Sequence, residues 1–145
     1  MRYAAFLLMS IAVGGPLRAA EWRAGAIVVS QPWSRPTPPA VSAGAVYFSI
    51  TNTGSRPDRL IALSTPLART VEIHETLREH GNIRMRAVAT VACAPGAPVA
   101  IAPGGMHVML VGLTSPLVAG EVFPLTLKFR DAGILELRVT VSAPE

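Results

Sequence analysis

The sequence predicts an all-β protein, folded as a single domain into a β-sandwich or open barrel. Half of the 145 residues are apolar, which supplies a core for one domain of this length. Runs of β-branched and aliphatic residues recur roughly every ten residues, and the 13 prolines and 12 glycines are spread between them. No segment shows the 3.6-residue periodicity of an amphipathic helix.

Three strands are predicted in the first half of the domain. Residues 26–30 (AIVVS) form a short apolar strand, which a proline-rich crossing at 31–39 follows. Residues 44–52 (GAVYFSITN) have the strongest strand pattern, and they end at an Asn-Thr-Gly turn. Residues 58–64 (DRLIALS) return from that turn.

The second half is predicted from the same signals. Residues 70–77 and 82–91 form a hairpin, with the turn placed at 78–81 because Gly81 can adopt a positive φ angle. The later strands are expected at 99–102, 106–113, 121–130 and 134–141, the last two joined by Asp-Ala-Gly at 131–133.

The N-terminal residues have the pattern of a secretory signal peptide. Arg2 precedes an apolar run, 3–13, and small residues follow a Gly-Gly-Pro break. We therefore expect a signal peptide at 1–19, cleaved near Ala19 or Ala20, and a mature domain at 20–145 outside the cytoplasm. The apolar run is shorter than the ~20 residues that a membrane span needs, so no span is expected.

The charge pattern excludes several classes of function. The formal net charge is +4, and loss of Arg2 and Arg18 with the signal peptide would lower it to +2. The basic residues are scattered, which argues against a nucleic-acid partner.

The sequence contains no GxSxG or HExxH motif and no plausible pair of catalytic carboxylates, so we do not expect an enzyme.

The chain contains one cysteine, Cys93, so an intramolecular disulfide is excluded. One interpretation of Cys93 is a redox thiol or a soft metal ligand. The other, which we favour, is an incidental strand residue, because no second cysteine is present to complete a redox pair.

Candidate metal ligands gather between residues 74 and 109, where all three histidines and the last three methionines lie. A turn folded symmetrically at 78–81 places His74 directly opposite Met85 and Arg84 opposite Glu75. His74 then shares the more polar face of its strand with Glu72 and Thr76, while Val71, Ile73 and Leu77 point to the core.

His107 and Met109 are two residues apart, so in a strand they share one face. Met106 alternates away from them, and we expect it to pack in the core, with a reserve role as an extra thioether. His80 lies at the expected turn and is more simply a solvated residue.

The donor types select the metal. Thioethers are soft and uncharged, which suits copper(I) and not zinc, calcium or magnesium. A blue-copper centre would need a cysteine among its ligands, and Cys93 lacks the following ligand pattern. Two imidazoles and two thioethers, from His74, Met85, His107 and Met109, therefore predict a copper(I) site, although each residue alone would more often be core or surface filler.

The spacing of these four residues, H-x10-M-x21-H-x-M, resembles the signature of the periplasmic copper A chaperone (PCuAC) family. Other segments resemble that family over nearly the whole mature chain: QPWSRPTPP at 31–39, GAVYF at 44–48, NTG at 52–54, PDRL at 57–60, PGG at 103–105 and PLTL at 124–127.

The resemblance implies a cupredoxin-like (Ig-like) β-sandwich in the periplasm that carries one copper(I) ion per chain at an exposed edge. It also implies delivery to the copper A centre in subunit II of cytochrome c oxidase, with Sco-type thiol proteins as further partners, and we expect a monomer. Residues 141–145 (VSAPE) lack the histidines and methionines of the tail that some relatives carry, so no second site for copper(II) is expected.

Two other functions stay open at this point. A protein that buffers or detoxifies copper would need the same site without a dedicated acceptor. A structural β-sandwich with incidental histidines would bind no metal at all.

Overall fold

The computed structural model describes residues 20–142, and within this range it contains eleven strands and no helix. The strands are β1 (Glu21–Ala24), β2 (Ile27–Ser34), β3 (Ala43–Asn52), β4 (Asp58–Ser64), β5 (Ala68–Glu79), β6 (Asn82–Val88), β7 (Val91–Cys93), β8 (Val99–Ile101), β9 (Met106–Leu113), β10 (Val122–Phe129) and β11 (Gly133–Val141). The signal peptide expected at 1–19 lies outside the described residues. Within them, no helix is long and apolar enough to cross a membrane.

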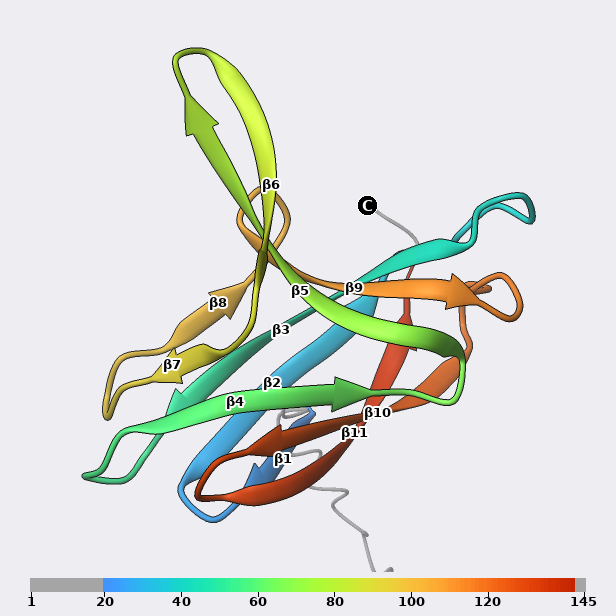
Figure 1. Ribbon diagram of the computed structural model, residues 1–145. Coiled ribbons are helices and arrows are strands. Elements are labelled where there is room, and N and C mark those ends of the chain that lie inside the picture. The colour runs from blue at the N-terminus through green and yellow to red at the C-terminus, as the bar shows by residue number, and fades with distance from the viewer. Residues whose placement is uncertain (1–19, 143–145) are drawn as a thin grey trace, which may run out of the picture.

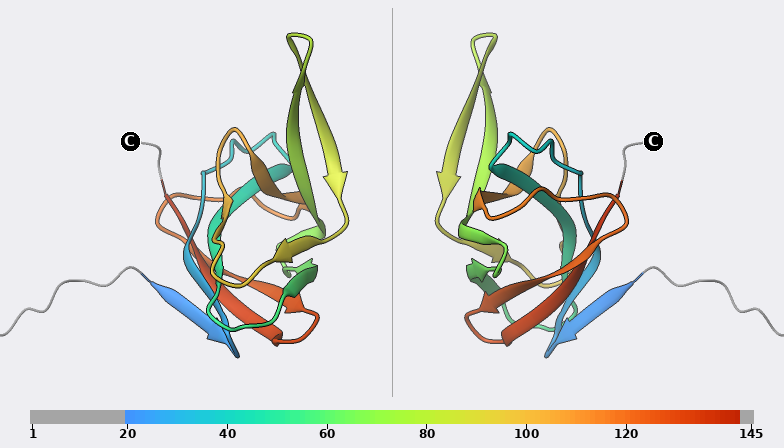
Figure 2. Two further views of the ribbon diagram at one scale, coloured as in Figure 1. Left: turned by 90° about the vertical axis from the view of Figure 1, so that its left-hand side faces the viewer. Right: turned by 90° about the vertical axis from the view of Figure 1, so that its right-hand side faces the viewer.

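The strands form one continuous sheet in the order β6-β5-β9-β3-β2-β11-β10-β4-β7, with β1 paired to β2 and β8 paired to β3. Neighbouring strands are antiparallel except β11 and β2, which run parallel. The sheet curls around its core until β4 lies beside β5 (Figures 1 and 2), but these two strands are not hydrogen-bonded neighbours, and Ile61, Leu63 and Val71 line a groove there. The predicted all-β sandwich or open barrel is confirmed.

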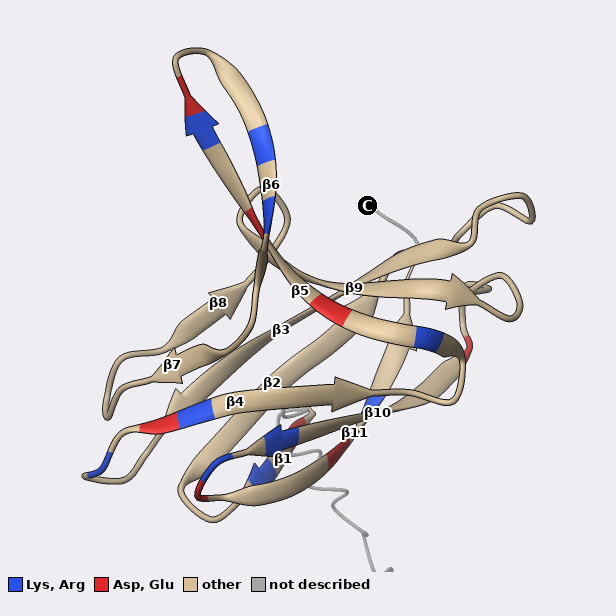
Figure 3. Ribbon diagram, in the orientation of Figure 1, with Lys and Arg blue, Asp and Glu red and all other residues tan. Residues whose placement is uncertain are grey.

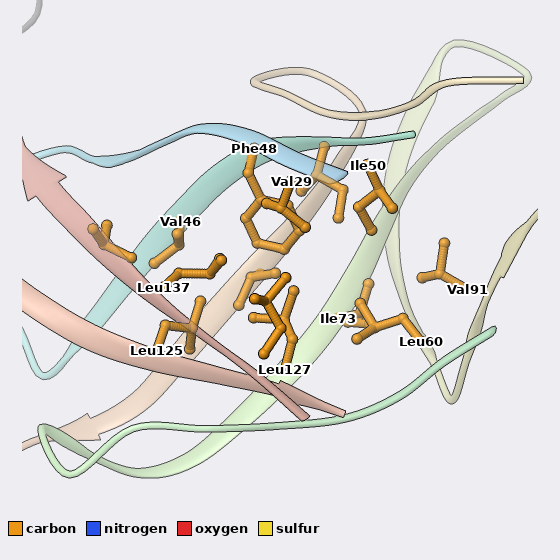
Figure 4. Packing of buried hydrophobic residues seen from close by; sticks show 14 of the residues in the cluster. Val29, Val46, Phe48, Ile50, Leu60, Ile73, Val91, Leu125, Leu127 and Leu137 are labelled. Atoms are coloured by element: carbon orange, nitrogen blue, oxygen red, sulfur yellow. The ribbon is translucent and has the colours of Figure 1, made fainter. Parts of the chain in front are cut away.

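Alternating apolar residues of the strands fill the interior, as the period-two pattern requires. Figure 4 shows this packing around Phe48, Leu125 and Leu127, which come from strands on opposite sides of the curl. Ile73 on β5 and Val108 on β9 are buried in the same core. The core therefore anchors both strands that carry the candidate histidines.

The predicted proline-rich crossing is in part a strand. β2 continues through Pro32 to Ser34, and its register against β3 shifts between Ser30 and Trp33. Gln31 has a φ angle of 54° at this point, which identifies a β-bulge. Pro32 is tolerated because a bulge interrupts the ladder hydrogen bonds that proline cannot donate.

Two further strands differ from the prediction. β1 pairs with β2 through a turn at Gly25, whose φ angle is 54°. The segment predicted as one strand at 82–91 belongs to two strands. β6 pairs with β5 and ends at Val88, whereas β7 begins at Val91 and pairs with β4. Short strands such as β1 and β7 carry too few residues for a period-two signal in the sequence.

Asp58 fastens the β10–β11 turn to the start of β4. Its carboxylate accepts hydrogen bonds from the backbone N–H groups of Arg59, Asp131 and Ala132 at distances of 2.7, 2.9 and 2.9 Å. Burial alone would raise the pKa of this carboxyl, but the three N–H donors and the nearby Arg130 guanidinium bring the pKa below its usual 3.8.

We expect Asp58→Ala to lower the free energy of unfolding by about 2 kcal/mol, because it leaves backbone donors without an acceptor. The pKa is lower in the folded protein, so the stabilisation is complete above the unfolded-state pKa and is lost as the pH falls through the folded-state pKa. Urea unfolding at neutral and acidic pH measures this. The gap between wild type and Asp58→Ala should narrow in acid, and a constant gap would contradict the assignment. Asp131→Ala, which removes an exposed carboxylate, is the matched control.

Candidate metal centre

β5 and β6 form a long hairpin that stands clear of the barrel (Figures 1 and 2). β9 begins at Met106, opposite Glu75, so β5 pairs only with β6 beyond that point. We call residues 76–85 the arm. The candidate ligand Met85 lies on the arm, whereas His74, His107 and Met109 lie where β5 and β9 pair.

The turn at the tip of the arm sets the register of the hairpin. Glu79 pairs with Asn82, so the connection is the two-residue turn His80-Gly81, with φ angles of 49° and 79°. Two positive φ angles are typical of the type I′ turn, whose twist matches that of the flanking strands. This turn is centred one residue later than the sequence analysis expected.

The expected pairing of His74 with Met85 is therefore wrong. His74 faces Ala87, and Met85 faces Thr76. The register differs from the expected one by two residues. Because strand side chains alternate between the two faces, Met85 still lies on the face that carries His74. Met85 is the diagonal neighbour of His74, and such diagonal neighbours are typically about 7–8 Å apart, with their Cβ atoms somewhat closer.

The expected partner of Glu75 is corrected by the same shift. Arg84 faces Leu77, and Arg86 faces Glu75, with its Nη2 2.6 Å from the Glu75 Oε2. Arg84 instead lies 3.8 Å from Glu79. Both ion pairs are on the face of the hairpin turned away from His74, so they leave the candidate ligands free of competing cations.

His74 and His107 face each other directly across β5 and β9. Their ring centroids are 5.7 Å apart and the rings meet edge to face, at 68°. A metal–nitrogen bond is about 2 Å long and the ring centre lies roughly 1 Å further back, so two imidazoles on one ion have centroids about 5–6 Å apart. The pair fits a single metal ion.

Met109 lies one step along β9 on the same face, opposite Glu72 of β5 and opposite Ala45 of β3. The small Ala45 side chain leaves room beside the thioether. Met109 is half-buried, and its backbone position makes it the diagonal neighbour of His74 on the side away from Met85. His74 therefore lies between the two thioethers.

Accessibility increases outward across the centre. His107 is 7% exposed, the His74 side chain 21% and Met85 62%. The sequence-based expectation of an accessible site thus holds for Met85 and not for His107, which is buried. The centre has a buried end and a solvent-facing end.

Both imidazoles have a partner on one ring nitrogen. The Nε2 of His74 is 2.8 Å from the Glu72 Oε2, and the Nδ1 of His107 is 3.4 Å from the backbone oxygen of Gly105. Each contact makes the bonded nitrogen the N–H donor and leaves the lone pair on the other nitrogen. Each imidazole therefore has one nitrogen available to a metal.

The surroundings do not provide a site for a hard cation. β3 and β9 carry no charged residue along their length, and of the strands that carry the candidate ligands only β5 and β6 bear Lys, Arg, Asp or Glu (Figure 3). Among residues 20–142, no group of three His, Cys, Asp or Glu side chains could hold a metal ion. A metal ion held here by three or more side chains would therefore include a thioether, and a thioether donor favours a soft ion.

A family assignment agrees with this geometry. A family model described as "Putative lipoprotein LpqE-like" matches residues 27–141, which include every strand from β2 to β11 and all four candidate ligands. The chain belongs to the LpqE-like family. The family match spans the barrel and the arm together, so the arm is part of the family's domain.

Two proteins are similar to this chain in sequence. A putative lipoprotein of Leifsonia xyli subsp. xyli (strain CTCB07) is 31% identical over 122 residues, which are 82% of this chain and 71% of that protein. An uncharacterized protein of Rickettsia prowazekii (strain Madrid E) is 34% identical over 105 residues, 70% of this chain and 58% of that protein.

Solved structures with the same fold are PCuAC domains. The copper-bound PCuAC domain from PmoF2 has a TM-score of 0.75 and 29% identity, covering 86% of this chain and 99% of that one. Apo-DR1885 from Deinococcus radiodurans has a TM-score of 0.65 and 28% identity, covering 99% and 97%. Its copper(I) form, CuI-DR1885, gives 0.58 and 29% over 77% and 74%. The likeness to the PCuAC family and the cupredoxin-like fold expected from it are confirmed.

The other residues considered as ligands lie apart from the centre. His80 is exposed at the tip of the arm, as expected for a solvated turn residue. Met106 packs against the core. Cys93 is buried on β7, and burial raises the pKa of its thiol, which disfavours the reactive thiolate. The interpretation of Cys93 as a plain strand residue agrees with this placement.

A row of aromatic residues next to the imidazoles was missed in the sequence. Trp33 of β2 pairs with Tyr47 of β3, with ring centroids 4.9 Å apart, and the Arg35 guanidinium lies 5.9 Å from both rings. Tyr47 is one position beyond the Val46–Val108 pair, so it is next to His107 in the same cross-strand row. The row covers the β3 side of the centre. Only the long-range pairing of β3 with β9 reveals it.

Proposed function

We propose that this protein is a copper(I) carrier that binds one ion through His74, His107, Met109 and Met85 and delivers it to the copper A centre of cytochrome c oxidase subunit II. The observation that supports it most is the facing pair His74–His107, with centroids 5.7 Å apart and a thioether one step away on the same face. The copper-bound structures of similar PCuAC domains agree with this choice of metal.

The donor set suits a cargo that must be both held and released. All four donors are neutral, and thioethers need no deprotonation before they bind a soft ion. His107 and Met109 would form the fixed end of the site. Met85 would complete it when the arm bends toward β9, because Met85 and Met109 lie on opposite sides of His74 in the strand register.

The outward gradient of exposure suggests an order of release. Met85 is 62% exposed, so a donor on the acceptor can displace it before it reaches the buried His107. Ligand exchange in steps keeps copper(I) bound to a protein throughout the transfer. A single domain outside the cytoplasm, with residues 1–19 as a cleaved leader, suits this role, and Sco-type thiol proteins are further proposed partners.

Copper(I) titration under anaerobic conditions, followed by X-ray absorption on the loaded protein, tests the site. The proposal requires one copper(I) per chain with both sulfur and nitrogen neighbours. Absence of stoichiometric binding would leave the structural sandwich as the better reading, and an all-nitrogen or all-oxygen shell would overturn the ligand set.

Transfer to the purified copper A domain tests the delivery role separately. The loaded protein should assemble the copper A centre, followed by its visible absorption. Tight copper(I) binding without transfer to this acceptor would favour a buffering protein, since the binding site would be the same in both.

Met85→Ala and Met109→Ala are each expected to weaken copper(I) binding by about tenfold or more, a loss of about 1.4 kcal/mol or more in binding free energy. Each removes one soft donor, while the fold persists because neither thioether belongs to the core cluster. Competition with a chromophoric copper(I) chelator gives the affinities. Ile83→Ala, on the same face of the arm and equally exposed at 62%, is the matched control for Met85. Wild-type affinity in both methionine variants would contradict the assignment.

A further inference from the structure

We propose that Glu72 is a positioning residue for the copper site: it holds the His74 imidazole by Nε2 so that His74 binds copper(I) through Nδ1. The inference rests on the proposed copper(I) function and specifies which atoms of the site act. It starts from the 2.8 Å contact between the Glu72 Oε2 and the His74 Nε2.

The strand geometry makes this contact a built feature of β5. Glu72 and His74 are two residues apart and project from the same face, where their partners on β9 are Met109 and His107. β9 carries no charged residue, so Glu72 is the acidic group of this part of the face. Among the described residues, the ion pair that Glu72 forms is with His74.

The contact decides which nitrogen of His74 is free. A carboxylate only accepts hydrogen bonds, so the Nε2 must carry the proton and donate it. The lone pair of the neutral ring is then on Nδ1. A carboxylate that orients a metal-binding histidine through its second nitrogen is a common arrangement around metal ions.

His107 has the opposite arrangement. Its Nδ1 lies 3.4 Å from the Gly105 backbone oxygen, an acceptor, so its free lone pair is on Nε2. The two facing imidazoles therefore have their free lone pairs on different ring nitrogens. In the proposed site, His74 would bind copper(I) through the nitrogen nearer its own backbone, and His107 through the nitrogen farther from its backbone.

Glu72 also changes the charge of the loaded site. The four donors are neutral, so copper(I) bound to them leaves one positive charge. The Glu72 carboxylate, next to His74, compensates that charge without occupying a coordination position. Its side chain is 50% exposed, so solvent screens part of this effect.

Three variants separate the hydrogen bond from the charge. Glu72→Gln keeps an acceptor oxygen and removes the charge, and Glu72→Leu removes both. Glu75→Gln is the matched control, because Glu75 is on the same strand with a carboxylate 2.6 Å from Arg86 but on the opposite face. Circular dichroism and thermal unfolding of each variant verify that the barrel is intact.

Nitrogen-15 NMR of the histidine side chains, with and without copper(I), is the primary readout. In the copper-free wild type, His74 should be the Nε2–H tautomer, and copper(I) should shift its Nδ1. Glu72→Leu should lose this tautomer preference and bind copper(I) about tenfold more weakly, within the 10–100-fold range known for partners of metal ligands. Glu72→Gln should fall between, and Glu75→Gln should match the wild type.

Two results would overturn the inference: copper(I) on Nε2 of His74, or unchanged tautomer and affinity in Glu72→Leu. Failure of the wild type to bind copper(I) would overturn the proposed function along with it. The two failures are distinguishable, because the first occurs in a protein that binds copper(I) stoichiometrically.

Discussion

His107→Asn should abolish copper(I) binding for practical purposes, lowering the affinity by more than about 100-fold, beyond the 10–100-fold contributed by residues that merely support metal ligands. His107 is the most buried of the four proposed donors, at 7% exposed, so neither water nor another side chain can take its place. His74 on β5 would also lose the imidazole that it faces on β9. Chelator competition under anaerobic conditions measures the loss.

His80→Asn is the control for this prediction. His80 is the same residue type on an exposed turn, 49° in φ, where asparagine is well tolerated. Its affinity for copper(I) should equal that of the wild type. A large loss in His80→Asn would place a ligand at the tip of the arm, and a small loss in a folded His107→Asn would exclude His107 as an essential ligand.

Leu110→Ala should destabilise the fold by about 3 kcal/mol, since truncation of a buried leucine costs 2–5 kcal/mol. Leu110 is fully buried in β9, two residues beyond Val108, and its side chain packs in the core on the face opposite Met109. The four ligands keep their positions, so the folded fraction should bind copper(I) with wild-type affinity. Urea unfolding and copper(I) titration at low temperature measure the two effects.

Ile134→Ala is the control for Leu110→Ala. The Ile134 side chain is 68% exposed, so its truncation should change the free energy of unfolding by less than about 0.5 kcal/mol. Copper(I) should raise the unfolding midpoint of the wild type and of Leu110→Ala alike, because it binds the folded state. A Leu110→Ala protein that is stable but does not bind copper(I) would mean that the core residues of β9 shape the site directly.

The fold could be predicted where a strand has a strong period-two pattern and clear turns. β4 and β9 begin and end where the sequence indicates, at 58–64 and 106–113. β1 and β7 are too short to give a pattern, and the division of the segment 82–91 depends on β7 pairing with β4. Such pairings join segments that are distant in the sequence, so they cannot be predicted from the residue pattern of one segment.

The strand face on which each candidate ligand lies could be predicted from the sequence, but the residue that each ligand faces across the hairpin could not. The alternation of strand side chains correctly predicted the shared faces of His74, His107 and Met109, because this alternation depends on the backbone alone. The error lay in the turn: a shift of its centre by one residue moves the facing residue by two, from Met85 to Ala87. Whether a Gly-containing turn has two or more residues depends on how strand twist and φ angles combine, which spacing does not reveal.

The parallel pairing of β2 with β11 also determines when this protein can fold. Trp33 and Thr140 are neighbours in the sheet although roughly 100 residues separate them in the chain, so their loop is long and closes slowly. The histidine-bearing strands lie on one side of this junction and the β10–β11 hairpin on the other. The two parts of the sheet are therefore joined only when β11 pairs with β2, so the barrel that supports the candidate metal centre is complete only once β11 has been synthesised.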